Sequence, residues 1–207
     1  MKLELLLQRE DFHSIFTQTL KRYLTDNYEW NGEIIWGERS KNLSENFLVN
    51  EKINLIFPKN IKSNTLRALA SEYGFNKNIL KYIAQQAYIY LSTTHILRGL
   101  LSSDFLTIQP FPELLSNICI LPGNNSIRLI FQDESKCIVL LKDKFNEKRL
   151  KNTIRVRLKH KDIPGPKILN HDIAAGWYIE EKIVGLPINR MFDYSKKNAA
   201  LVKANAF

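Results

Sequence analysis

The sequence predicts an α+β protein in which a mainly helical N-terminal domain, residues 1–110, is followed by an antiparallel sheet with one helix. Two observations predict this class. Before residue 110, apolar residues recur mostly at three- and four-residue steps, which is the spacing of amphipathic helices. After it, short apolar runs alternate with polar turns, which is typical of antiparallel strands. The 207 residues, of which 44% are hydrophobic, are enough to bury a core of this kind.

Three helices are expected in the N-terminal part, over residues 11–23, 63–73 and 76–101. Asp11 is placed to cap the first of them, and Gly74 is the usual left-handed terminator for the second. The third is the longest, and its apolar spacing predicts that it is the central helix of this half.

Two extended segments lie between the first and second of these helices. Residues 30–36 contain the turn signal Asn31-Gly32, and residues 47–57 end at Pro58. Both are expected to be short strands, and they are candidates for pairing with each other.

The second half is expected to follow a simple order of elements. Polar turns at 122–125 and 133–136 separate three strands, a basic helix follows, and two more strands come after a Pro-Gly-Pro exit. The expected strands are 118–121, 126–131, 137–142, 167–169 and 177–183, and the expected helix is 146–159.

The overall charge favours anionic partners. Thirty Lys and Arg residues against 21 Asp and Glu residues give a net charge of +9, which suits nucleotides, nucleic acid or acidic lipid.

Cys119 and Cys137 have no CxxC spacing, so neither a zinc site nor a disulfide framework is indicated, and a reducing cytoplasm fits best. The apolar run at the start is too short for a signal peptide, and no stretch approaches the roughly 18 apolar residues of a membrane span.

Three segments of the second half carry a resemblance to a known family. They read CIVLLK at 137–142, IPGPKIL at 163–169 and WYIEEKIVGLPINR at 177–190. In this order they look like the aminoglycoside phosphotransferase and choline kinase family of small-molecule kinases. The resemblance implies that residues 111–190 form the N-terminal lobe of a kinase-like fold and that residues 191–207 are a tail.

The resemblance also implies a site for ATP. Lys142 at the end of a strand would meet the nucleotide phosphates. Strand alternation places Leu140 on the same face as Lys142, where it would contact the adenine ring. The remaining expected cofactor-binding residues lie in the turn of the first hairpin and in the hinge that follows the last strand, and they are Gly123, Asn124, Ser126, Glu181 and Ile183.

Several parts of a working kinase are missing from the sequence. Thr153 stands where the family has the glutamate that pairs with the lysine, and Glu147 lies about 120° away around the helix. Either the alignment with the family slips at this helix or the pair is missing. No HxDxxxxN-like catalytic loop follows Arg190, and this loop would supply the catalytic Asp and a Mg²⁺ ligand. We therefore expect a truncated kinase-like protein, inactive alone, in which Mg²⁺ takes part only if another chain supplies a second lobe.

A second function class is compatible with the same residues. The chain could be a non-catalytic binding or assembly module whose basic surface meets an acidic partner or nucleic acid, although a solvated helix face is the simpler explanation of the charges. An apolar hinge face at Ile183, Val184 and Leu186 would favour self-association. The basic residues concerned are Lys144, Lys148, Arg149, Lys151, Arg155, Arg157, Lys159 and Lys161. The first 110 residues contain no functional motif.

Overall fold

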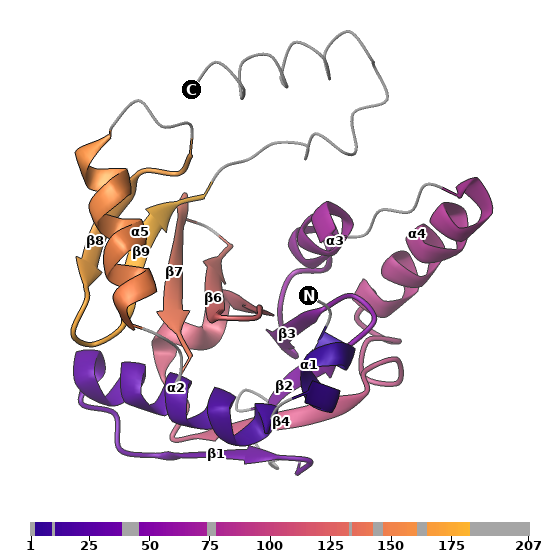
Figure 1. The fold of residues 1–207 in the computed structure, drawn as a ribbon. Helices are drawn as coiled ribbons and strands as arrows, with labels where there is room; N and C mark the ends of the chain where they lie inside the picture. Colours follow the sequence, from indigo (N-terminus) through magenta and orange to yellow (C-terminus); the bar gives the residue numbers. More distant parts are fainter. Residues whose placement is uncertain are drawn as a thin grey trace, which may run out of the picture.

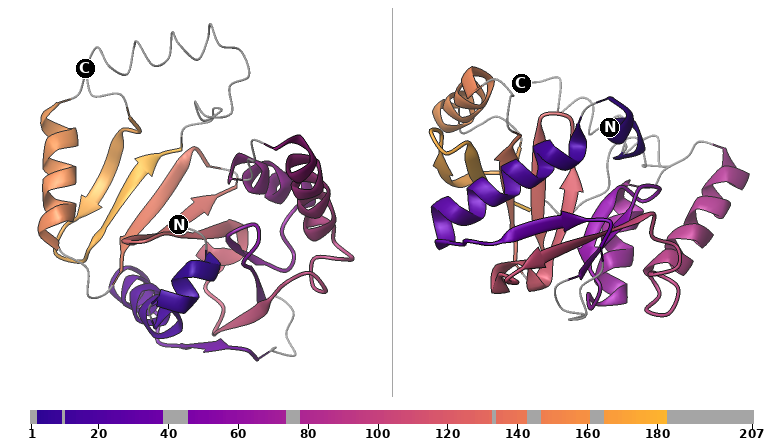
Figure 2. Two further views of the ribbon diagram at one scale, coloured as in Figure 1. Left: turned by 45° about the vertical axis from the view of Figure 1, so that its right-hand side comes forward. Right: turned by 90° about the horizontal axis from the view of Figure 1, so that it is seen from below.

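The computed structural model describes residues 3–9, 11–38, 46–73, 78–132, 134–142, 147–160 and 165–182. These residues contain a nine-stranded sheet with the order β1-β4-β2-β3-β5-β6-β7-β9-β8. All neighbouring strands are antiparallel. The sheet is strongly bent, so that β1 and β4 at one end run across the direction of β7, β8 and β9 at the other (Figures 1 and 2). The α+β class is therefore confirmed.

The described residues of the N-terminal part form four helices and four strands. They are α1 (Leu3–Arg9), α2 (Phe12–Tyr28), β1 (Glu33–Trp36), β2 (Asn46–Asn50), β3 (Leu55–Pro58), α3 (Ser63–Tyr73), α4 (Ile79–Thr93) and β4 (Asp104–Gln109). The predicted helices at 11–23 and 63–73 are present. The Asp11 side chain caps α2 by accepting a hydrogen bond from the Ser14 backbone N–H, at 3.4 Å. Gly74 lies outside the described residues.

The expected pairing of the first two strands is wrong. Residues 47–57 hold two strands, β2 and β3, which pair with each other across a turn at 51–54. β1 pairs instead with β4, which lies between β1 and β2. No strand is predicted over residues 104–108. The pairing of β1 with β4 joins segments some 70 residues apart, and no short-range sequence pattern indicates such a partner.

The helix predicted over 76–101 is present but shorter, and its predicted central position is wrong. α4 ends at Thr93, and residues 94–101 form a bend and turns. The helix lies at one side of the molecule beside α3 (Figure 1). Its apolar spacing is genuine, but much of its apolar surface is exposed rather than buried.

The second half follows the expected order of elements. After a short 3₁₀ helix, η2 (Glu113–Asn117), come β5 (Ile118–Pro122), β6 (Ser126–Phe131), β7 (Lys136–Leu141), α5 (Glu147–Lys159), β8 (Ile168–Asp172) and β9 (Trp177–Glu181). β9 pairs with both β7 and β8. Three strands, a helix and two strands are therefore present where the sequence predicts them.

The sheet is continuous across residue 110. β3 pairs with β5, and each of the two hydrophobic cores contains residues from both halves of the chain. The first core includes α1, α2 and one face of the sheet, and the second includes α3, α5 and the other face. The predicted boundary near 110 is therefore not a break in the sheet.

A buried arginine joins the segments on either side of α3 and α4. The Arg98 side chain donates to the carbonyl oxygens of Lys59 at 3.0 Å, Ile61 at 2.7 Å and Thr93 at 3.2 Å. It also donates to the Ser63 hydroxyl at 2.6 Å. Burial lowers the pKa of this guanidinium, since a desolvated charge is disfavoured. Its hydrogen bonds fix the loop before α3 against the turns after α4.

Among the residues that the structure describes, no helix is long and apolar enough to cross a membrane.

Candidate functional site

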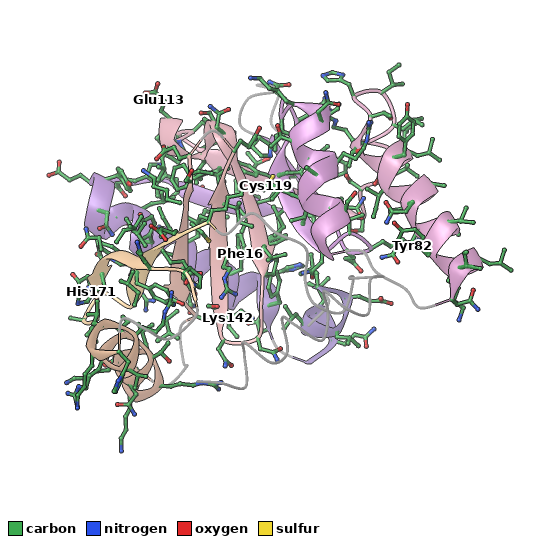
Figure 3. The ribbon with its side chains drawn as sticks, turned by 90° about the horizontal axis from the view of Figure 1, so that it is seen from above. Phe16, Tyr82, Glu113, Cys119, Lys142 and His171 are labelled. Atoms are coloured by element: carbon green, nitrogen blue, oxygen red, sulfur yellow. The ribbon has the colours of Figure 1, made fainter. Side chains whose placement is uncertain are left out.

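The side chains expected to bind a nucleotide from β7 are buried in the protein. Leu140 and Lys142 are each 1% exposed. Leu140 belongs to the same hydrophobic core as Phe12 and Phe16 of α2. The Lys142 ammonium lies 5.2 Å from the centre of the Phe12 ring, in a cation–π contact. Figure 3 shows Lys142 and Phe16 near the middle of the molecule.

Helix α2 is what covers this face. Its apolar side packs in one core with the β6 and β7 residues that share the face of Leu140. Arg22 Nη2 donates a hydrogen bond to the Leu141 carbonyl oxygen, at 2.9 Å, and so holds α2 against the end of β7. In this conformation a nucleotide cannot reach Leu140, because α2 occupies the surface that an adenine ring would contact.

The predicted phosphate-binding turn is an ordinary β-hairpin turn beside Lys142. The Gly123 N–H donates to the Ser126 carbonyl, at 2.9 Å, and the Lys142 N–H donates to the Asn125 carbonyl, at 3.2 Å. Asn124 is exposed and Ser126 half-buried. The fold therefore brings turn and lysine together, as the sequence predicts, but the Gly123 N–H already has a partner and does not point to a ligand.

Helix α5 packs on the opposite face of β7 from Lys142. Its buried residues Leu150 and Ile154 share a core with Val139 and Leu141, whose side chains alternate with that of Lys142. Thr153 is exposed, and its hydroxyl donates to the Arg149 carbonyl at 2.9 Å. The position where the resemblance expects a glutamate thus faces solvent, on the side of α5 away from the sheet.

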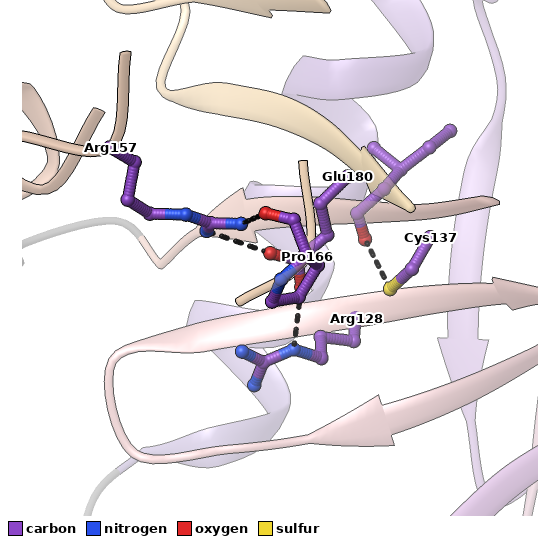
Figure 4. A network of polar contacts seen from close by, with 6 residues as sticks. Arg128, Cys137, Arg157, Pro166 and Glu180 are labelled. Atoms are coloured by element: carbon purple, nitrogen blue, oxygen red, sulfur yellow. Dashed lines mark hydrogen bonds and ion pairs between the residues drawn. The ribbon is translucent and has the colours of Figure 1, made fainter. Parts of the chain in front are cut away.

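The two adjacent glutamates of β9 have different surroundings. Glu180 is buried, and its Oε2 accepts a hydrogen bond from Arg157 Nη1 of α5, at 2.8 Å. Its Oε1 lies 3.7 Å from Arg128 Nε of β6, and Arg157 also donates to the Pro166 carbonyl (Figure 4). The ion pair between Arg157 of α5 and Glu180 of β9 holds α5 on the sheet.

Glu181, the predicted hinge residue, is half-buried, and its N–H donates to the Lys167 carbonyl at 2.9 Å. The Glu181 N–H already has this partner, so it is not free to donate a hydrogen bond to an adenine ring. Ile183 lies outside the described residues, as do Val184 and Leu186.

Neither cysteine has the environment of a reactive thiol. Cys119 and Cys137 are buried and not disulfide-bonded, and burial raises the pKa of each to about 12. In the described part of the chain, no group of three or more His, Cys, Asp or Glu side chains could hold a metal ion.

The open candidate site is a groove between α5 and β8, with a volume of about 430 Å³. Lys151, Arg155 and Lys159 line it, one turn apart along α5, and all three are exposed. Apolar side chains form the rest of its wall together with His171, namely Ile154, Leu158 and Ile173. We call these seven residues the α5–β8 groove.

The sequence analysis found the cations of this groove but not its opposite wall. The strand predicted at 167–169 stops short of His171, which lies in the edge strand β8. Arg157, one of the basic residues noted in the sequence, pairs with Glu180 instead of lining the groove, and Lys144 and Lys161 lie outside the described residues. Alternation along β8 could have suggested the wall, had the strand been predicted to reach residue 172.

Comparisons of the chain with protein-family models, with curated proteins and with solved structures find no match.

Proposed function

We propose that this chain is a non-catalytic binding module whose α5–β8 groove takes an acidic, partly apolar segment of a partner protein. The observation that carries the proposal is the exposure of Lys151, Arg155 and Lys159 along one side of α5, beside an apolar wall. By contrast, the side chains of Leu140 and Lys142, which a kinase-like function would need, are covered by α2.

The chemistry of the groove favours a peptide over a nucleic acid. Three cations one helical turn apart match carboxylates with the same spacing on a partner helix. Leu158 and Ile173 would contact apolar side chains between those carboxylates. Single-stranded nucleic acid is usually bound on aromatic rings, and Phe, Tyr and Trp do not occur among the seven groove residues.

A fluorescein-labelled helical peptide of about 16 residues, with glutamates beside leucines on one face, tests the proposal by fluorescence anisotropy. The full chain should bind it, and Arg155→Glu should weaken binding by roughly 10-fold or more because the charge repels the peptide. Arg149→Glu is the matched control, since Arg149 is an exposed cation of α5 outside the groove.

The proposal predicts that affinity falls as salt is raised and that a peptide with its leucines replaced by serine binds more weakly. Equal losses in the Arg155 and Arg149 variants would contradict it, because the groove would then have no special role. Stronger binding of a thymidine oligonucleotide than of the peptide would point instead to nucleic acid.

The second candidate is the kinase-like nucleotide-binding lobe. The order of β5, β6, β7, α5, β8 and β9 supports it, as does the contact between the Lys142 backbone and the hairpin turn. ATP would then bind weakly, and only after α2 has left the face of Leu140. Mg²⁺-dependent phosphoryl transfer would also need a second, catalytic lobe.

Calorimetric titration of the full chain with ATP and Mg²⁺ tests this second candidate. Because α2 covers the face of Leu140, we expect the titration to show no saturable heat of ATP binding. Saturable binding that Lys142→Ala abolishes would favour the nucleotide site, whereas binding unchanged in Lys142→Ala would place the nucleotide elsewhere. No phosphotransferase turnover on sugar, choline or aminoglycoside acceptors is expected from the chain alone.

A further inference from the structure

Helix α4 has an apolar face that is largely uncovered in the described part of the chain. Five large side chains of the helix are substantially exposed: Ile79 (72%), Leu80 (74%), Ile83 (58%), Tyr90 (55%) and Leu91 (44%). We call these five residues the α4 stripe. The fully buried residues of α4 are instead Ile89, Ser92 and Thr93, on the side that faces α3 and the sheet.

The stripe is one continuous face of the helix. At 100° per residue, its five members fall within about 120° of arc. The only charged residue of α4, Lys81, lies outside that arc. Arg67 of α3 packs its guanidinium 4.2 Å from the centre of the Tyr90 ring, which holds this end of the stripe in place. Figure 3 shows α4, marked by Tyr82, at one side of the molecule.

Along this face, the five large side chains form two groups. Ile79, Leu80 and Ile83 lie near the start of α4, and Tyr90 and Leu91 lie near its end. Between them are Ala84 and Ala87, which are exposed but small. Two helices can approach closely at alanines, so this pattern has room for a second helix crossing at its middle.

The size of the stripe is suited to a modest dimer interface. Each large side chain exposes on the order of 100 Å², so the five present on the order of 500 Å² per chain. Two such faces together bury about 1,000 Å², which is the lower limit for a specific interface. An apolar patch of this size is also near the upper range found on monomers.

We infer that the α4 stripe is a homodimer interface, in which α4 packs antiparallel against α4 of a second copy around a two-fold axis between Ala84 and Ala87. In that arrangement the first group of each stripe meets the second group of the other, and the alanines lie at the crossing. A two-fold axis requires a self-complementary face. The stripe meets this condition because none of its five residues is charged, and because the group at the start of each helix can pack against the group at the end of the other.

Sedimentation velocity of the full chain over a range of concentrations tests the interface. Wild type should form dimers, and Ile83→Glu should weaken dimerisation by roughly 30-fold or more, because it buries a carboxylate in each half of the interface. Gln85→Glu is the matched control, since Gln85 lies on the other side of the same helix and should not change the association.

Both variants should keep the far-ultraviolet circular dichroism of wild type, because Ile83 and Gln85 are not core residues. A wild-type chain that stays monomeric at about 0.5 mM, well above the micromolar range of weak specific complexes, would overturn the inference. So would a dimer that Ile83→Glu leaves intact. Co-sedimentation of such a monomer with phosphatidylcholine vesicles would assign the stripe to a lipid surface instead.

A short bismaleimide crosslinker tests the antiparallel orientation. The native thiols at Cys119 and Cys137 are buried, so an introduced cysteine is the accessible one. Ala87→Cys should crosslink to its own copy across the two-fold axis. Ile79→Cys should not, because its partner lies near Leu91 of the other chain. Efficient crosslinking of the Ile79 variant as well as of the Ala87 variant would show a parallel pair and overturn the arrangement.

Discussion

The Glu180→Leu substitution is expected to lower the free energy of unfolding by about 2–3 kcal/mol. The side chain of Glu180 is 7% exposed and that of Arg157 is 20% exposed, and their charged atoms are 2.8 Å apart. Breaking a fully buried pair costs about 3–5 kcal/mol, because the remaining charge is left without a partner in the protein interior. Since Arg157 retains some contact with water, the expected loss lies at or just below the lower end of that range, at about 2–3 kcal/mol.

Arg128 contributes less to the stabilisation of Glu180. Its side chain is 41% exposed and its Nε lies 3.7 Å from the carboxylate, so water and salt screen the attraction. Arg128→Gln is therefore expected to cost under about 1 kcal/mol, and it serves as the control for the loss of a weaker ion pair with the same carboxylate.

Urea denaturation of Glu180→Leu, of Arg157→Leu and of the double variant Arg157→Leu/Glu180→Leu completes the measurement. The double variant should be more stable than the sum of the single losses implies, by at least about 1 kcal/mol, because neither charge is then left unpaired. Additive losses would refute the reasoning, since they would mean that the two side chains stabilise the protein independently.

Two further predictions follow from buried polar groups. Arg98→Met should lower stability by about 3 kcal/mol, and the melting temperature by about 6–12 °C, because it leaves several carbonyl groups without donors; a melting temperature within about 2 °C of wild type would contradict this. Cys119 and Cys137 should resist iodoacetamide at pH 8 in the folded chain and react in urea. Because their folded pKa values of about 12 lie above the ordinary value of 9.0, they stabilise the fold fully below about pH 9, and this contribution should be lost as the pH rises towards 12. Replacing both by alanine should flatten that part of the stability profile, and an unchanged profile would rule the thiols out as its cause.

The second half of the fold could be predicted from the sequence because its contacts are local. Turns at 122–125 and 133–136 join strands that pair with their neighbours in the chain, so the pattern of apolar runs and polar turns is sufficient. The first half has pairs such as β1 with β4, which join distant segments. No local signal specifies such a partner.

The candidate site shows the same limit. Alternation correctly placed Leu140 and Lys142 on one face of β7, but it could not show that α2 covers that face. The contact between Arg22 and Leu141 joins residues 119 positions apart. In α4, helical spacing predicted a buried face where the structure has an exposed one, because periodicity identifies an apolar side without identifying what it packs against.

Hydrogen exchange of the full chain, with and without the acidic peptide, tests the central claim most directly. The proposed binding mode predicts slower exchange in α5 and β8 when the peptide is bound, with β7 unchanged because α2 continues to cover it. Protection of β7 and of the turn at 122–125, with none in α5 or β8, would contradict the proposal, since the ligand would then occupy the face that α2 covers.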